Sequence, residues 1–165
     1  MLGKKEIKKY FGDAAGLNVL IVGDVMIDSY IWGTVDRISP EAPVPIVTVN
    51  RRASLLGGAA NVALNIKAMG GNPILCSVIG NDSKGNEFLQ LLEKEELTTE
   101  GIVRSKDRIT TTKFRIIGNN YQMLRVDEET DTELNTKEAD ELIQCFNSLL
   151  KTYPIHVVII QDYNK

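Results

Sequence analysis

The stretch Gly57-Gly58-Ala59-Ala60-Asn61-Val62-Ala63, followed by Gly70 and Gly80, has the residue types and spacing to bind a small polar molecule. Two adjacent glycines let the backbone turn sharply and approach a ligand, because neither carries a Cβ. The small and aliphatic residues after them predict a helix whose first N–H groups can bind a polar or anionic ligand. Asn61, in its first turn, both donates and accepts hydrogen bonds. The stretch therefore indicates a cradle for a hydroxyl-rich molecule.

Two carboxylates stand beside the first predicted strand. Asp24 and Asp28 follow the apolar run at residues 18–22. In open α/β sheets ligands bind outside the carboxyl ends of the strands, so both carboxylates lie where a ligand is expected. A carboxylate accepts hydrogen bonds and can take two vicinal hydroxyls. Asp24 either contacts a ligand or caps a turn, whereas the position of Asp28 favours ligand contact.

A second group of side chains could bind an anion. Arg37 begins a loop at residues 37–45 that three prolines stiffen, and a guanidinium can hold a phosphate with two hydrogen bonds. A predicted hairpin supplies further candidates, namely Lys113, Arg115, Gln122 and Arg125. Charges on hairpins are common, so each residue alone indicates little. Together with Arg37 they make an anionic substrate plausible.

The predicted secondary structure must position these side chains. Apolar runs predict strands at residues 18–22, 74–79 and 156–160, and helical spacing predicts helices at 4–11, 60–69, 84–95 and 136–153. Strands that alternate with helices indicate βαβ units, and hence a parallel sheet covered on both faces. The predicted fold class is therefore α/β.

Two pairs of segments break this pattern, because β-forming residues alternate there with polar ones. They are residues 29–35 with 44–51, and residues 110–117 with 121–127 around Gly118-Asn119-Asn120, a strong hairpin signal. Alternation is typical of a sheet with one face in solvent. We expect a small antiparallel sheet, built from two insertions, that projects from the parallel core and covers the ligand site as a lid.

Composition narrows the class of protein. The 165 residues suffice for one domain with a buried core, and 19 basic against 22 acidic residues leave no electrostatic footprint for nucleic acid or a membrane surface. Neither a secretory signal nor an apolar run of membrane-spanning length occurs in the sequence. We therefore expect a cytoplasmic protein with neither nucleic acid nor membrane as its partner.

Few residues suit metal or histidine chemistry. His156 is the only histidine, which excludes a His-based triad and a multi-His zinc site, and we expect it to begin a strand. Cys76 and Cys145 lack metal-ligand spacing and are expected to be reduced thiols. The acidic residues 127–131 lack EF-hand spacing and predict a solvated turn, so no metal ligand is assigned. The sequence also lacks the glycine motifs of dinucleotide sites and P-loops.

At this point the sequence resembles the ribokinase, or PfkB, family of sugar kinases. Residues 57–80 match the N-terminal signature of that family throughout, and residues 23–28 resemble its sugar-binding first strand, whose last Asp matches Asp28. Within the family, residues 23–28, 37–45 and 162–165 resemble the heptose 7-phosphate kinase branch, which includes the kinase domain of ADP-heptose synthase. The resemblance covers nearly the whole chain.

The resemblance implies a ribokinase-like parallel sheet flanked by helices, with a small β lid. On this basis residues 1–165 form a partial domain, with a core at about 1–28, 57–107 and 128–165 and a lid at about 29–56 and 108–127. The implied reaction transfers the γ-phosphoryl group of Mg-ATP to O1 of D-glycero-β-D-manno-heptose 7-phosphate. That step leads to the ADP-heptose used for the lipopolysaccharide core.

Roles for individual residues follow from the resemblance. Those implied to hold the sugar are Asp28, Gly57, Gly58 and Asn61. The cationic lid residues are candidates for the 7-phosphate, and Asp162 would face the reaction centre. Lids of this family often pair between subunits, which implies a homodimer.

The sequence departs from the family in one large respect. The general base of the family lies in a Gly-Ala-Gly-Asp motif of its C-terminal half, which also forms the nucleotide pocket, and this motif is absent from the 165 residues. We therefore expect this chain alone to be inactive. Two alternatives stay open: a kinase of the same family for another sugar, such as a fructose phosphate, and a non-catalytic module for sugar-phosphate binding or dimerisation.

Overall fold

The computed structural model describes residues 3–163, with Ile7 described by its backbone alone. Its helices are α1 (Lys4–Ala14), α2 (Ala59–Ala68), α3 (Ser83–Lys94) and α4 (Thr136–Thr152). Its strands are β1 (Asn18–Gly23), β2 (Val25–Ile38), β3 (Pro45–Gly58), β4 (Asn72–Gly80), β5 (Ile102–Ser105), β6 (Thr112–Gly118), β7 (Tyr121–Glu128) and β8 (Val157–Gln161). The strands form two four-stranded sheets. Each strand and each helix that the sequence predicts is present in the structure.

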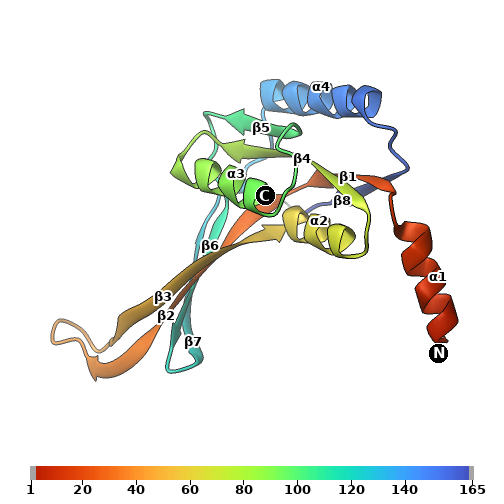
Figure 1. The fold of residues 1–165 in the computed structure, drawn as a ribbon. Coiled ribbons are helices and arrows are strands. Elements are labelled where there is room, and N and C mark those ends of the chain that lie inside the picture. Colours follow the sequence, from red (N-terminus) through yellow and green to blue (C-terminus); the bar gives the residue numbers. More distant parts are fainter. Residues whose placement is uncertain (1–2, 164–165) are drawn as a thin grey trace.

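The core sheet is parallel and has the strand order β5-β4-β1-β8. Helices α2 and α3 cover one face and α4 covers the other, as Figure 1 shows. Leu20 and Ile21 of β1 point to opposite faces and are both fully buried. This arrangement explains why the predicted strands are continuous apolar runs, and it confirms the α/β prediction.

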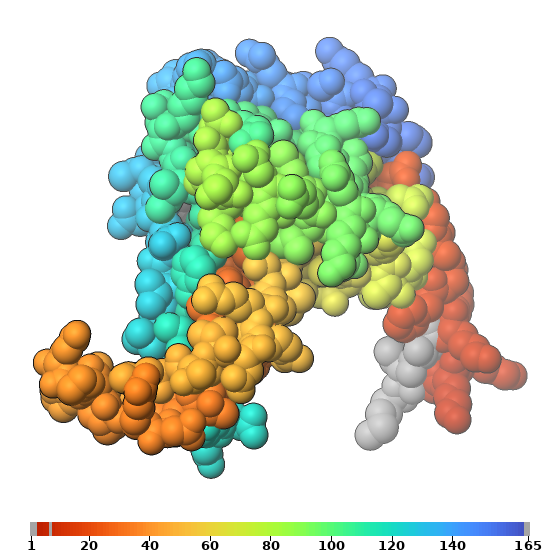
Figure 2. Space-filling model, turned by 60° about the vertical axis from the view of Figure 1, so that its left-hand side comes forward, coloured from red at the N-terminus to blue at the C-terminus, as the bar shows by residue number. Residues whose placement is uncertain are grey.

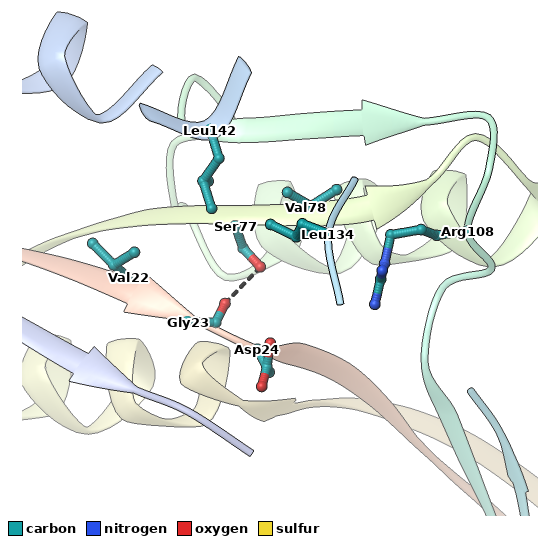
Figure 3. Close-up of a pocket in the computed structure, with 8 residues that line it drawn as sticks. All are labelled: Val22, Gly23, Asp24, Ser77, Val78, Arg108, Leu134 and Leu142. Atoms are coloured by element: carbon teal, nitrogen blue, oxygen red, sulfur yellow. Dashed lines mark hydrogen bonds between the residues drawn. The ribbon is translucent and has the colours of Figure 1, made fainter. Parts of the chain in front are cut away.

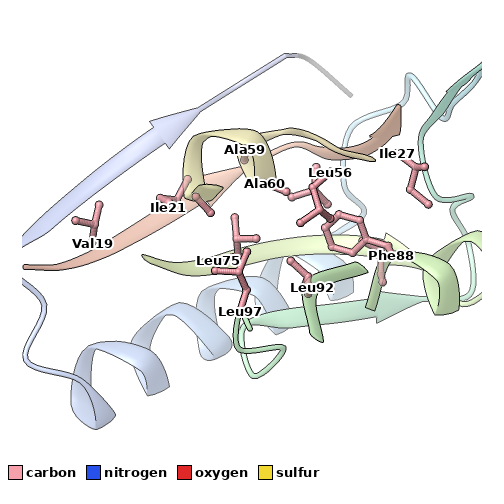
Figure 4. Packing of buried hydrophobic residues seen from close by; sticks show 13 residues of the cluster. Val19, Ile21, Ile27, Leu56, Ala59, Ala60, Leu75, Phe88, Leu92 and Leu97 are labelled. Carbon is pink, nitrogen blue, oxygen red and sulfur yellow. The ribbon is translucent and has the colours of Figure 1, made fainter. Parts of the chain in front are cut away.

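The main core cluster lies between the sheet and helices α2 and α3 (Figure 4). Phe88 of α3 is fully buried there, which contributes roughly 1.5–3 kcal/mol of transfer free energy. Ala59, Ala60 and Ala63 line the buried side of α2. Their small side chains let this helix lie close to the sheet, and so fix its N-terminus.

The second sheet, which we call the projecting sheet, has the order β3-β2-β6-β7 and extends away from the body of the molecule (Figures 1 and 2). Its two hairpins are antiparallel, as predicted. The hairpins join each other through β2 and β6, however, and this pair is parallel. The sheet is thus mixed, because both strands leave the core sheet in the same direction.

Short connections hold the two sheets together. Asp24 alone separates β1 from β2, and β3 runs into α2 with no residue between them. Asp82 forms a further link, because its carboxylate accepts hydrogen bonds from the backbone N–H of Gly85 (2.6 Å) and of Thr110 (2.8 Å). Burial raises the pKa of Asp82, but these hydrogen bonds outweigh it and lower the pKa. Asp82 therefore caps α3 and also anchors the segment that leads into β6.

The remaining elements lie farther from the junction. Helix α1 extends from the core sheet and exposes Tyr10 and Phe11. His156 precedes β8, and its Nδ1 accepts a hydrogen bond from the Asn18 N–H (2.9 Å).

Within residues 3–163, no helix combines the length and apolar character needed to span a bilayer.

Candidate substrate-binding site

A cavity of about 360 Å³ lies where the core sheet meets the projecting sheet. Its lining comes from all four strands of the projecting sheet, from the start of α2 and from the residue that follows β8 by two positions. The lining residues are Met26, Asp28, Gly57, Gly58, Asn61, Val62, Lys113, Arg115, Arg125 and Tyr163. Seven of these were predicted as substrate-binding residues, so the fold brings most of the predicted site together. We call this space the junction cavity.

The two glycines allow the backbone to pass close to its neighbours. Gly58 has a φ of 59°, and a Cβ there would lie 2.3 Å from the carbonyl oxygen of Asp24. That oxygen accepts the Ala59 N–H at 2.8 Å, which ties the start of α2 to the end of β1. At Gly57, a Cβ would lie 3.0 Å from Oδ2 of Asp28. Any larger residue would therefore crowd this carboxylate or move the helix.

The N-terminus of α2 opens onto the junction cavity. Its N-cap, Gly58, offers no side chain to the first N–H groups of the helix. Asn61 lies in the first turn and is exposed. These donors can bind hydroxyl or anionic oxygens, as the sequence predicts.

Asp28 is paired with a cation across the projecting sheet. Its Oδ1 accepts a hydrogen bond from Nη1 of Arg115 at 2.5 Å. The guanidinium of Arg115 lies 5.2 Å from the ring centre of Tyr30. Partial burial would lower the pKa of Arg115, but its contact with Asp28 outweighs burial and raises it. Asp28 thus holds the guanidinium of Arg115 at the cavity.

Two more cations line the same cavity. Nζ of Lys113 lies 3.0 Å from Asp127 and 3.6 Å from Glu129, and Nε of Arg125 lies 2.9 Å from Asp127. Lys113 and then Arg125 hold the pKa of Asp127 below its ordinary value. The residues predicted as part of a solvated acidic turn therefore take part in ion pairs at the cavity.

Asp24 lies in a neighbouring cavity of about 80 Å³ at the carboxyl ends of β1 and β4 (Figure 3). Its Oδ2 accepts the backbone N–H of Tyr163 at 2.7 Å, which brings that residue to the junction cavity. Arg108 lines the smaller cavity and donates to the carbonyl oxygens of Thr132 (2.8 Å) and Thr130 (3.3 Å). Asp24 thus has a clear structural role, whether or not it also contacts a ligand.

Three further candidates lie outside the lining of the junction cavity. Arg37 is exposed near the tip of the β2–β3 hairpin, and Gln122 is exposed near the start of β7. Asp162 is exposed and precedes Tyr163. Their substrate roles stay predictions. Asn164 and Lys165, the last residues of the resemblance at 162–165, lie outside the described residues.

Sequence reasoning missed a row of stacked side chains beside the cavity. The rings of Tyr30 and Trp32 stack with centroids 5.2 Å apart and an interplanar angle of 12°, and the guanidinium of Arg51 lies 3.8 Å from the Trp32 ring centre. Asp28, Tyr30 and Trp32 alternate along β2, so they share one face of the sheet. The two-residue spacing of Asp28, Tyr30 and Trp32 in the sequence could have predicted that their side chains lie in one row.

Comparison with known proteins agrees with this architecture. The sequence profile of the pfkB family carbohydrate kinase matches residues 17–159. The bifunctional protein HldE of Helicobacter pylori (strain HPAG1) is 43% identical over 147 residues, which are 89% of this chain and 31% of that protein. HldE of Caulobacter sp. (strain K31) is 42% identical over 153 residues, covering 92% of this chain and 30% of the relative. The chain thus spans about a third of the length of these relatives.

Solved structures show the same fold at lower sequence identity. The tetrameric inhibited form of phosphofructokinase-2 from Escherichia coli has a TM-score of 0.62 and 18% identity, covering 88% of this chain and 45% of that one. Ribokinase from Cryptococcus neoformans var. grubii serotype A, in complex with ADP, has a TM-score of 0.52 and 22% identity, covering 73% and 37%. These matches confirm the ribokinase-like fold. The matched profile, which covers residues 17–159, shows that this chain belongs to the pfkB family of carbohydrate kinases.

Proposed function

We propose that the junction cavity binds the sugar acceptor of a kinase reaction, and that this acceptor is heptose 7-phosphate. The observation that carries the proposal is the meeting, in one cavity, of a diol-binding carboxylate, a glycine loop at a helix N-terminus and three cations. The first two features suit a sugar ring and the third suits a phosphate. The resemblance of residues 37–45 to heptose 7-phosphate kinases, and the identity to HldE proteins, support the choice of sugar.

The sugar ring is assigned to the core side of the cavity. There the carboxylate of Asp28 accepts hydrogen bonds from ring hydroxyls, while Asn61 and the N–H groups that follow Ala59 in the first turn of α2 donate to them. At Gly57 a Cβ would lie 3.0 Å from Oδ2 of Asp28, so the glycine leaves room for the ring beside this carboxylate. Gly58 fixes the start of α2 through its φ of 59°. The 7-phosphate is assigned to Lys113, Arg115 and Arg125, since cationic nitrogens form strong hydrogen bonds with phosphate oxygens.

Kinases of the pfkB family use ATP, and we propose that Mg-ATP is the phosphoryl donor here too. We assign the residues of the junction cavity to the sugar phosphate and none of them to the nucleotide. The part of the chain that the structure describes holds no group of three or more His, Cys, Asp or Glu residues placed to bind a metal ion. We therefore assign acceptor binding to these residues and derive no step with the nucleotide from them.

The proposal is tested by titration calorimetry of the chain with heptose 7-phosphate, fructose 6-phosphate and ATP. We expect heptose 7-phosphate to bind most tightly, and Asp28→Asn to weaken it by at least about tenfold because the amide accepts fewer hydrogen bonds. Asp140→Asn, an exposed carboxylate of α4, is the matched control and should leave binding unchanged. Tighter binding of fructose 6-phosphate would favour a kinase for another sugar.

A turnover assay separates the kinase from a non-catalytic module. We expect the 165-residue chain to bind the sugar phosphate without turning over ATP, because its sequence lacks the Gly-Ala-Gly-Asp motif. ATP turnover with heptose 7-phosphate at an ordinary kinase rate would contradict that expectation. Turnover by a longer form that contains the motif, and its loss on mutation of the motif, would exclude the module.

The projecting sheet is also proposed to pair with that of a second copy. Its apolar side chains Tyr121, Leu124 and Val126 are 42–76% exposed, which suits burial against another sheet. Analytical ultracentrifugation should show a dimer, and Leu124→Lys should shift it toward the monomer. A monomer at all concentrations would contradict this part of the proposal.

A further inference from the structure

The carboxylate assigned to the sugar already has a charged partner in this structure. Oδ1 of Asp28 and Nη1 of Arg115 are 2.5 Å apart, and the two side chains are 24% and 21% exposed. Both residues line the junction cavity. A sugar that approaches the carboxylate must therefore compete with a guanidinium for the same oxygen.

The other carboxylate oxygen faces the glycine loop. A Cβ at Gly57 would lie 3.0 Å from Oδ2, so this oxygen lies against the backbone of the loop. A diol that uses both oxygens of Asp28 competes for Oδ1 with Arg115, which already occupies one of the two lone pairs of this oxygen. Displacement costs affinity, because charge-assisted hydrogen bonds are stronger than those between a carboxylate and a neutral hydroxyl.

Arg115 differs from the other cations of the cavity in where its partner lies. Lys113 and Arg125 pair with Asp127 of β7, the strand that carries Arg125 and lies beside the strand of Lys113. The partner of Arg115 is instead Asp28, the residue that the sugar needs. The ring of Tyr30, 5.2 Å from the guanidinium, keeps Arg115 beside the cavity after the ion pair opens. Arg115 is thus the cation that sugar binding would release.

We propose that Arg115 determines specificity for phosphorylated sugars by exchanging partners, an inference that rests on the function proposed above. Before binding, Arg115 covers Asp28. When a sugar phosphate binds, its hydroxyls take Asp28 and its phosphate takes Arg115, so both charges keep a partner. A sugar without phosphate opens the same ion pair and leaves Arg115 without one. The site therefore selects against unphosphorylated sugars through the carboxylate that holds the ring.

The test compares heptose 7-phosphate with heptose, by calorimetry on the full chain and on Arg115→Met. The variant should bind heptose 7-phosphate about tenfold more weakly and heptose several-fold more tightly, because Asp28 is uncovered. These opposite changes distinguish the exchange from a simple phosphate contact, which would leave heptose binding unchanged. A merely structural role would weaken both.

Two controls use neighbouring arginines. Arg51→Met removes a guanidinium that stacks on Trp32 outside the cavity, and should change neither affinity. Arg125→Met removes a cation of the cavity that pairs with Asp127, and should not strengthen heptose binding. Arg115→Lys keeps the charge at the position, so it should fold and move both affinities in the same directions as Arg115→Met, by less.

The outcomes separate the inference from the function on which it rests. If wild-type protein does not prefer heptose 7-phosphate to heptose, the proposed function fails. If it does, and neither variant of Arg115 binds heptose more tightly, the function stands and the exchange of partners is wrong.

Discussion

The two sheets of this molecule differ in how far their side chains are buried and in how many charged side chains they carry. The core sheet is parallel, its central strands are apolar on both faces, and helices cover it on both sides. The projecting sheet carries ion pairs and stacked rings on one face, and many of its apolar side chains are exposed. The core sheet gains stability from burial, whereas the projecting sheet presents charges.

The candidate site lies where the two sheets meet, and it takes a different contribution from each. The core sheet fixes the start of α2, which packs on it and donates the Ala59 N–H to the Asp24 carbonyl oxygen after β1. The projecting sheet supplies Asp28, the two glycines and the cations. Substitutions in the core should therefore change the free energy of unfolding most, and substitutions in the projecting sheet should change ligand affinity most. The following variants test that division.

The largest loss of stability is expected from Phe88→Ala, because this side chain is fully buried in the core cluster. The free energy of unfolding, measured by urea denaturation, should fall by about 3–5 kcal/mol. Tyr121→Ala in the projecting sheet, where the side chain is 76% exposed, should change it by less than about 0.5 kcal/mol. Equal effects at the two positions would overturn the division between the sheets.

The next largest effect is expected at the junction itself. Gly58→Ala puts a Cβ 2.3 Å from the Asp24 carbonyl oxygen at a φ of 59°, and should cost about 2–3 kcal/mol of unfolding free energy. Sugar-phosphate binding should be lost as well, since the start of α2 must move. Gly12→Ala, where a Cβ meets no atom within 4 Å, should leave stability unchanged or raise it slightly.

In the projecting sheet, Lys113→Met should act mainly on binding. The affinity for heptose 7-phosphate is expected to fall about tenfold, because a phosphate partner is removed. The free energy of unfolding should fall by only about 1 kcal/mol, since the ion pairs with Asp127 and Glu129 are partly exposed. Calorimetry and urea denaturation of the same preparation would show whether binding or stability changes more.

The link between the sheets through Asp82 predicts a dependence on pH. Its pKa in the folded state is below the ordinary value of 3.8, so the ionised group stabilises the fold above pH 3.8. That stability is lost as the pH falls from about 4 through the lowered pKa. Asp82→Asn, which still caps α3, should cost about 1 kcal/mol at pH 7 and should make acid unfolding less steep. An unchanged acid slope would show that other carboxylates dominate.

The smallest effect is expected from Gln122→Ala. The side chain is exposed and lies outside the lining of the junction cavity, so the affinity for heptose 7-phosphate should change less than twofold. A larger loss would mean that Gln122 reaches the ligand by another route, such as from a second copy of the chain.

The sequence predicted the core sheet well, because burial on both faces leaves continuous apolar runs such as residues 18–22. It was less informative about the projecting sheet. The alternating pattern predicted its first strand from residue 29, but β2 begins at Val25, separated from β1 by one residue, and its first apolar residues are buried at the junction. The short strand β5 was missed, and the parallel pairing of β2 with β6 joins segments far apart in sequence.

The site shows the same contrast. Gly57, Gly58 and Asn61 are close in sequence, so their local pattern predicted a single loop. The ion pair between Asp28 and Arg115 joins residues 87 positions apart, and no local pattern indicates it. Arg37 is the opposite case. Its guanidinium is suited to phosphate, but the residue lies near the tip of the β2–β3 hairpin and outside the lining of the junction cavity. Residue type predicts which chemistry is possible, and the long-range pairing of strands decides where it occurs.

The stack on β2 gives the chain an internal optical reporter. Trp32 is the only tryptophan among the 165 residues, so the long-wavelength fluorescence of the protein comes from a single ring. That ring touches Tyr30, which in turn lies under the guanidinium of Arg115. The proposed release of Arg115 from Asp28 would therefore change the surroundings of the fluorophore by way of one intervening ring. We expect substrate binding to be visible in stopped-flow fluorescence without any label.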